Sequence, residues 1–172
     1  VWSAPGVWLE DGSIVFEMPG LGETRILRRL APGGKEPVAF SSGIVRNPTA
    51  LPGGKGLLVE GNRNLIHFPA GGGEGTVVMQ RAQRGRYIDG GYLVFFRNGG
   101  LYAVRFDLDR MRPEGEEVAL LDGVDAQGLR GVQYDVSAKG DVVYRRGRKR
   151  SSERVLSWLG PNGELARILT KP

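Results

Sequence analysis

Short runs of hydrophobic residues alternate along this chain with short polar segments that are rich in glycine. The pattern is clearest around Asn98-Gly99, where one apolar run covers 92–96 and a second covers 101–108. In the second run apolar and polar residues alternate with a period of two, which is typical of a strand with one buried face. Because asparagine and glycine both accept a positive φ, the two runs predict a tight β-hairpin.

The outline of this hairpin recurs, because four glycine-containing turns are each followed by a run of β-forming residues. We call the glycines of these turns the marker glycines: Gly12, Gly54, Gly90 and Gly140. Their spacings are 42, 36 and 50 residues, with an average of about 43. A propeller blade of four strands takes roughly 40 to 45 residues, so the spacing predicts one blade for each marker.

Each marker run is followed by two further predicted strands. The second strands are expected at 25–30, 65–68, 101–108 and 155–159. The third strands are expected at 37–40, 76–80, 118–121 and 165–169. The turns between them are "PGGKE", "AGGGEG", "MRPEGEE" and "GPNGE". Strands joined in sequence by hairpins form a meander, which is the connection pattern of a propeller blade.

The predicted fold class is therefore all-β: a β-propeller segment of about four antiparallel meander blades. The blades are expected at roughly 5–42, 45–82, 86–122 and 127–172, within a single propeller domain or part of one. A blade cannot bury both of its faces alone, so neighbouring blades must complete the core. Four blades are the lower end of the usual range of roughly four to eight, which favours an incomplete ring. Bare strand edges in such a ring would favour self-association.

Composition supports many turns and excludes several other classes. The 172 residues include 28 glycines and 10 prolines, a share well above average usage. No apolar run approaches the roughly 18 residues of a membrane helix, so no membrane span is predicted. The chain has no cysteine, which excludes disulfides and thiolate metal sites.

The net charge of +5 is local. The segment 145–154 carries six basic residues against Glu153 and is itself +5, so the remainder is close to neutral. The candidate contacts for an anion or a partner are Arg145, Arg146, Arg148, Lys149 and Arg150. No aromatic residue lies among them to stack on a base, so nucleic acid is not the expected partner. The favoured interpretation is a hairpin loop whose charged side chains keep it exposed to solvent.

The remaining residue patterns do not predict catalytic or metal-binding chemistry. His67 is the single histidine, and its place in "LIHF" favours an ordinary strand residue over a base or metal ligand. No G-x-S-x-G elbow is present. Asp107 and Asp109 are too few for the six to eight oxygens that calcium prefers, so they are interpreted as solvated acids at a strand end. We expect no catalytic residue, no metal and no cofactor in this segment, which is predicted not to be an enzyme by itself.

Two tryptophans could line a ligand funnel or pack between blades. Trp8 precedes the first marker turn, and Trp158 lies within a predicted strand. Large aromatic side chains contribute most when they are buried, so packing is the favoured interpretation for both.

Four motifs carry a resemblance to a known family: "ALPGGKGLLVEG", "GYLVFFRNGGLYAVRFDLDR", "YDVSAKGDVVYRRG" and "VLSWLGPNGELARI". In this order they resemble the TolB-type, WD-repeat-like propellers that bacteria fuse to serine/threonine protein kinases. The resemblance implies a bacterial, extracytoplasmic sensor whose parent is a receptor-like kinase. Fold alone does not fix function in such propellers.

The expected function is a non-catalytic binding, scaffold or sensor module that presents rim loops to a protein, a peptide or a small ligand. The alternative is the propeller part of a hydrolase or peptidase whose catalytic domain lies outside this segment. A third hypothesis, nucleic-acid binding through 145–154, is less favoured, because that segment lacks stacking aromatics.

Overall fold

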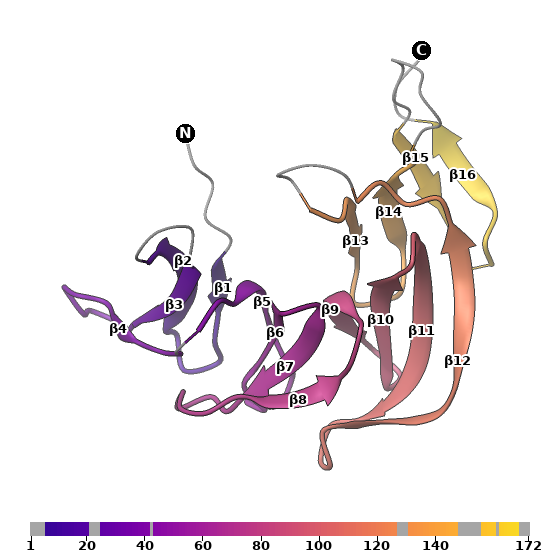
Figure 1. Ribbon diagram of the computed structural model, residues 1–172. Coiled ribbons are helices and arrows are strands. Elements are labelled where there is room, and N and C mark those ends of the chain that lie inside the picture. Colours follow the sequence, from indigo (N-terminus) through magenta and orange to yellow (C-terminus); the bar gives the residue numbers. More distant parts are fainter. Residues whose placement is uncertain are drawn as a thin grey trace. The chain divides into compact units, whose positions relative to one another are not determined.

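The computed structural model describes residues 6–20, 25–41, 43–126, 131–147, 156–160 and 162–168 (Figure 1). These residues contain sixteen strands and no helix. The strands form four sheets of four strands each, and within every sheet the strands follow one another in sequence order. The prediction of an all-β propeller segment built from meanders is therefore confirmed. The described residues contain no helix that is long and apolar enough to cross a membrane.

The bounds of the strands follow, sheet by sheet. The first sheet contains β1 (Gly6–Trp8), β2 (Ile14–Pro19), β3 (Arg25–Leu30) and β4 (Val38–Ala39). The second contains β5 (Arg46–Ala50), β6 (Leu57–Gly61), β7 (Asn64–Phe68) and β8 (Thr76–Met79). The third contains β9 (Gln83–Ile88), β10 (Tyr92–Arg97), β11 (Gly100–Asp107) and β12 (Arg112–Asp122). The fourth contains β13 (Tyr134–Val136), β14 (Val142–Arg145), β15 (Leu156–Leu159) and β16 (Leu165–Ile168).

The marker glycines lie in the turns that lead into β2, β6, β10 and β14. All four have a positive φ, at 78° for Gly12, 65° for Gly54, 90° for Gly90 and 93° for Gly140. A side chain at such a φ meets its own backbone, so glycine is the favoured residue there. The repeat seen in the sequence is thus a repeat of one turn conformation.

The hairpin predicted around Asn98-Gly99 is also confirmed. Asn98 has a φ of 51° and Gly99 a φ of 87°, and Arg97 pairs with Gly100 across the turn. The rings of Phe95 and Tyr102 stack at 5.9 Å between centroids on the two paired strands. Turn geometry and cross-strand packing therefore specify the same register.

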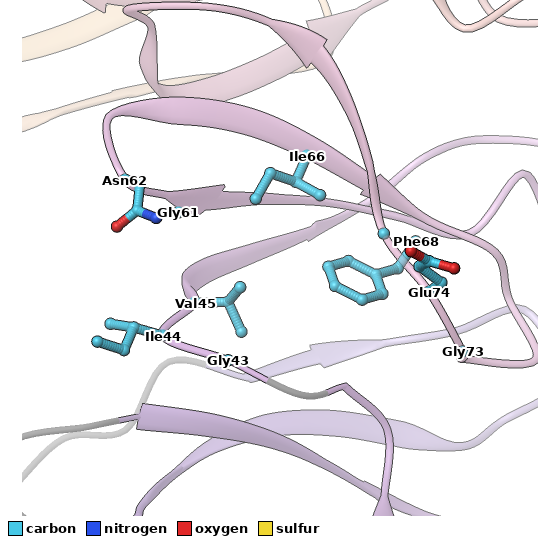
Figure 2. A pocket seen from close by; sticks show the side chains of 10 residues that line it. Gly43, Ile44, Val45, Gly61, Asn62, Ile66, Phe68, Gly73 and Glu74 are labelled. Atoms are coloured by element: carbon cyan, nitrogen blue, oxygen red, sulfur yellow. The ribbon is translucent and has the colours of Figure 1, made fainter.

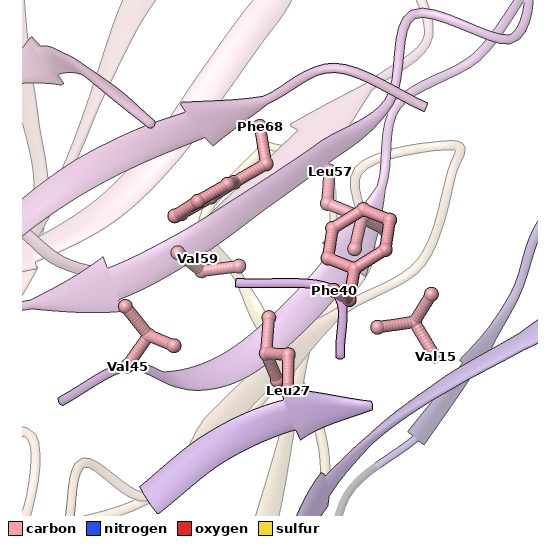
Figure 3. Packing of buried hydrophobic residues seen from close by; sticks show 7 residues of the cluster. All are labelled: Val15, Leu27, Phe40, Val45, Leu57, Val59 and Phe68. Carbon is pink, nitrogen blue, oxygen red and sulfur yellow. The ribbon is translucent and has the colours of Figure 1, made fainter. Parts of the chain in front are cut away.

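The chain forms two compact units. The first comprises 1–85 and 108–112, and the second comprises 86–107 and 113–172. In the first unit, residues of the first two sheets share one hydrophobic cluster (Figure 3): Val15, Leu27, Phe40, Val45, Leu57, Val59 and Phe68. In the second unit, a corresponding cluster is made by Val94, Phe96, Leu101, Val124, Val132, Tyr134 and Val142. In the first unit, one sheet face is thus buried against the next sheet, as the repeat predicts.

Two details of the prediction were wrong. Each sheet has four strands and not three, because a strand also precedes every marker turn: β1, β5, β9 and β13. These strands escaped prediction because they lack an apolar run; β5 contains Pro48 and β9 contains Gly85. The segment "MRPEGEE" is not a turn, since β12 begins at Arg112. β12 is an exposed edge strand, and an edge strand tolerates charge and proline.

Candidate functional site

Two marker turns of the first unit enclose a hollow, which we call the marker-turn hollow. One turn leads from β1 to β2 and the other from β5 to β6. Each turn is closed by a backbone hydrogen bond, from the Leu9 amide to the Ser13 carbonyl at 2.8 Å and from the Leu51 amide to the Gly56 carbonyl at 2.9 Å. The hollow has a volume of about 260 Å³. Its lining residues are Leu9, Glu10, Asp11, Ala50, Leu51, Gly54, Gly56 and Ala70.

The two acidic side chains of this hollow differ in their contacts. Asp11 accepts hydrogen bonds from the Ser13 amide at 2.9 Å and the Ser13 hydroxyl at 2.5 Å, and it forms an ion pair with Arg29. These contacts, the Ser13 hydroxyl first, lower the pKa of Asp11 from its ordinary value. Glu10 is exposed, and its carboxylate has no hydrogen bond or ion pair to another described residue. The hollow thus has an apolar lining and, in Glu10, an exposed carboxylate that is not already paired with another described residue.

The predicted basic contacts separate in the structure. Arg145 ends β14, where its Nη2 lies 2.5 Å from Oδ2 of Asp125, and the two residues also share a backbone hydrogen bond of 2.8 Å. Arg146 bridges to Val124 through its backbone, and its side chain is exposed. Arg148, Lys149 and Arg150 lie outside the described residues. The guanidinium of Arg145 therefore has an acidic partner inside its own unit, whereas that of Arg146 faces solvent.

The other residues considered in the sequence have ordinary surroundings. Nε2 of His67 lies 2.7 Å from the carbonyl oxygen of Lys55, and Nζ of Lys55 lies 2.7 Å from Oδ1 of Asp109. No group of three or more metal-ligating side chains occurs among the described residues. The packing prediction is wrong for Trp8, which is 67% exposed because it lies on the edge strand β1. The same prediction for the side chain of Trp158 lies outside the described part.

Sequence reasoning missed a buried polar chain, which we call the glutamate ladder: Glu17, Asn47, Glu60 and Gln83. The exposed fractions of Glu17 and Glu60 are 3% and 7%. The Asn47 amide donates to Oε1 of Glu17 at 2.6 Å, and Nδ2 of Asn47 donates to Oε2 of Glu60 at 3.1 Å. Nε2 of Gln83 donates to Oε1 of Glu60 at 3.2 Å. Asn47 reaches both glutamates from β5, with a φ of 54°.

Burial controls the charge of the first glutamate in this ladder. Desolvation raises the pKa of Glu17, and the nearby charge of Glu60 raises it further, whereas the Asn47 hydrogen bond and Arg25 and Arg46 act in the opposite direction. Nη1 of Arg25 is 3.7 Å from Oε2 of Glu17. The sequence did contain a signal, because Glu17 and Glu60 each end an apolar run at the fourth position of the strand that follows a marker turn.

A larger hollow lies beside β7 in the same unit, and we call it the glycine-lined pocket (Figure 2). Its volume is about 530 Å³. Its walls come from the segment 43–45, the hairpin between β6 and β7, and the loop that leads into β8. Half-buried Ile66 and buried Phe68 of β7 line it, and Glu74 supplies a carboxylate.

No protein-family model matches the chain, and no curated protein matches it. Among solved structures, it is similar to regucalcin, a calcium-binding protein from Agrobacterium tumefaciens strain C58, with 14% sequence identity and a TM-score of 0.60. The similarity covers 95% of this chain and 58% of that one. Regucalcin is a β-propeller. The fold of this chain is a propeller fold.

The comparison shows the architecture and leaves the TolB-type and kinase-linked resemblance as a prediction. The chain spans less than two thirds of the length of the structure that it matches. In a propeller, loops at the ends of the blades form the rims from which ligands are contacted. The marker-turn hollow lies among such loops.

Proposed function

We propose that this propeller segment is a non-catalytic binding module that presents its marker turns to a protein or peptide. The observation that carries the proposal is the marker-turn hollow, in which loops of two successive sheets surround an apolar lining. The exposed carboxylate of Glu10 at this hollow favours a partner with a basic group. The turns are held by backbone hydrogen bonds, so little conformational entropy is lost when they bind.

A binding role without catalysis fits the side chains of the described residues. The single histidine is held by the backbone carbonyl of Lys55, and the side chain of Lys55 is paired with Asp109. A nucleophile, a base and an orienting group at hydrogen-bond distances would be required for covalent catalysis. We therefore place chemistry, where the parent protein has any, outside this segment.

By the family resemblance, we propose that the parent is a bacterial receptor-like kinase and that the propeller senses a ligand outside the cytoplasm. The alternative is the propeller part of a hydrolase or peptidase. The coding sequence around this segment separates the two. A kinase domain upstream supports the sensor, whereas an α/β-hydrolase domain downstream supports the alternative.

The binding role is tested by selecting random peptides displayed on phage against the immobilised protein. Selected peptides are then measured by calorimetry against the protein and two variants. Glu10→Lys reverses the charge at the hollow, and we expect it to weaken the selected peptides by about tenfold, because it removes an exposed ion pair and also places a like charge against the basic group of the peptide.

The matched control is Glu116→Lys, which makes the same change at an exposed position on β12 in the other unit. We expect it to leave affinity unchanged, and both variants to melt at the temperature of the unmodified protein. If no peptide is enriched, or if both variants bind the selected peptides equally well, the marker turns are not the binding surface.

A further inference from the structure

The glycine-lined pocket has the size of a small-molecule site. Pockets that hold small ligands generally have volumes of roughly 300 to 1,000 Å³, and the volume here is about 530 Å³. All of its lining residues belong to the first unit. It is separate from the marker-turn hollow, with which it shares no residue.

The apolar part of the pocket extends onto exposed surface. Phe68 is buried with 3% exposure, whereas Ile44 at the edge of the pocket is 49% exposed. Val77 of β8 is 48% exposed and pairs with Ile66 in register, so the two side chains lie on the same sheet face. An apolar floor that continues onto exposed Ile44 and Val77 is typical of a surface that binds a ligand.

Glycine lets the loop before β8 pack closely against β7. A Cβ atom at Gly75 would lie 2.5 Å from Cζ of Phe68 and 2.7 Å from Cγ2 of Ile66, which is too close for any side chain without movement. Gly43 and Gly73 have φ values of 99° and 112° and face open space. Other residues are strained at these φ values, so the backbone conformation favours glycine at both positions of the pocket wall.

Two polar side chains at the pocket have no hydrogen bond or ion pair to the rest of the described chain. Glu74 is exposed and, among the described residues, its carboxylate has no ion pair or hydrogen bond. The side-chain amide of Asn62 likewise has no partner in the described ranges. Glu74 carries the charge of the lining, so the potential at the pocket favours a cation.

From the apolar floor and this carboxylate, we infer that the glycine-lined pocket binds an organic ammonium ion with an aromatic or branched apolar body. The apolar body lies against half-buried Ile66, and the ammonium group pairs with Glu74. The same chemistry is presented by a small amine and by the free amino terminus of a peptide that begins with an apolar residue.

The test is a titration followed by backbone amide resonances, with phenethylamine and its neutral analogue phenethyl alcohol as probes. We expect the amides of Gly61, Gly73 and Gly75 to shift with both probes. The amine should bind about threefold to fivefold more tightly than the alcohol, because an exposed ion pair supplies a difference of this size. High salt should reduce that preference, since it screens exposed charges.

Two variants separate the charge from the fold. Glu74→Gln should bring the amine to the affinity of the alcohol without moving the melting temperature, whereas Glu116→Gln should keep the preference. Glu10→Lys should also keep it, so a failure of the marker-turn proposal and a failure of this one are distinguishable. Equal affinities for amine and alcohol in the unmodified protein, an unchanged preference in Glu74→Gln, or shifts confined to residues outside the pocket would overturn the inference.

A peptide that begins with phenylalanine, with its amino terminus free or acetylated, identifies the source of the cation. Tighter binding of the free peptide than of phenethylamine assigns the site to a chain terminus. Tighter binding of phenethylamine assigns it to a small amine. Either result supports the ammonium site, provided that the acetylated peptide is the weaker of the two peptides.

Discussion

The two ends of strand β2 hold carboxylates in opposite environments. Asp11 lies in the turn before the strand and is exposed, whereas Glu17 lies near its far end with 3% exposure. Both accept hydrogen bonds and both have an arginine nearby. Hydrogen bonds from Ser13 nevertheless lower the pKa of Asp11, while desolvation raises that of Glu17. Access to water therefore decides whether the polar contacts or the desolvation has the larger effect on the pKa of each carboxylate.

This difference gives the two carboxylates opposite effects on stability as the pH changes. The pKa of Asp11 is depressed in the fold, so its contribution is present above the unfolded value of 3.8 and is lost as the pH falls. The pKa of Glu17 is raised, so its contribution is present below the unfolded value of 4.5 and is lost as the pH rises toward the folded pKa. The two ends of the strand thus favour folding at opposite sides of this acidic range.

The change with the largest expected effect is Asn47→Ala, which interrupts the glutamate ladder. It removes the Nδ2 donor to buried Glu60. It also places alanine, which tolerates a left-handed φ less well than asparagine, at a φ of 54°. We expect the free energy of unfolding to fall by about 2 to 3 kcal/mol in urea titrations, from the unsatisfied carboxylate and the backbone strain together.

Asn47→Gly is the matched control. It also removes the side-chain donor, but it tolerates the φ and keeps the backbone amide that bonds Glu17 at 2.6 Å. Its loss should be about 1 kcal/mol smaller than that of Asn47→Ala. A loss below about 0.5 kcal/mol in Asn47→Ala would show that the ladder does not stabilise the fold, since ordinary substitutions at the protein surface change the free energy of unfolding by that amount.

The second change is Glu17→Gln, which removes the charge and keeps an oxygen that can accept from the Asn47 amide. Because burial raises the pKa of Glu17, the unmodified protein should lose stability relative to the variant as the pH rises above about 4.5. Thermal melts across the acidic range measure the difference. A variant whose stability falls relative to the unmodified protein over the same range would contradict the burial argument and assign the larger role to Arg25.

These two regions were not equally predictable from the sequence. Gly12 was recognised because a left-handed turn requires a specific residue type, and that requirement repeats at a fixed spacing. Short apolar runs likewise identified β2, β6, β10 and β14. The strand β5 was not predicted, because its place depends on packing against the neighbouring sheet and not on an apolar pattern in its own residues. The ladder was missed for the same reason, since Glu17 and Glu60 meet only through Asn47 of that strand.

The candidate sites show the same division. The marker turns were predicted as turns, but the hollow between two of them depends on how two sheets pack. Arg145 was predicted as a contact for a partner because the sequence shows a basic run, yet Asp125, its partner in the structure, is 20 residues away in sequence. Ion pairs between distant residues leave no local pattern. Local geometry was therefore predictable, and pairing across the sheet was not.

The third change tests whether the turn end of β2 is held by its backbone. Gly12 has a φ of 78°, and a Cβ there would lie 3.3 Å from Cγ of Pro32. Gly12→Ala should lower the free energy of unfolding by about 1 kcal/mol in urea titrations, from the left-handed φ. Gly71→Ala is the control, because that residue has no positive φ and open space around it. An equal loss in both variants would remove the conformational explanation.

The smallest effect is expected for Asp11→Asn, although Asp11 has more close contacts than Glu17. The asparagine oxygen can still accept from the Ser13 amide, so the variant loses the charge and keeps the turn. Because the pKa of Asp11 is lowered, the unmodified protein should have an advantage above about pH 4 that disappears as the pH falls below 3.8. High salt should also reduce the advantage, since the pair with Arg29 is exposed to solvent. Thermal melts at low and high salt measure it, and a loss larger than that of Gly12→Ala would mean that charge, and not backbone conformation, holds this end of the strand.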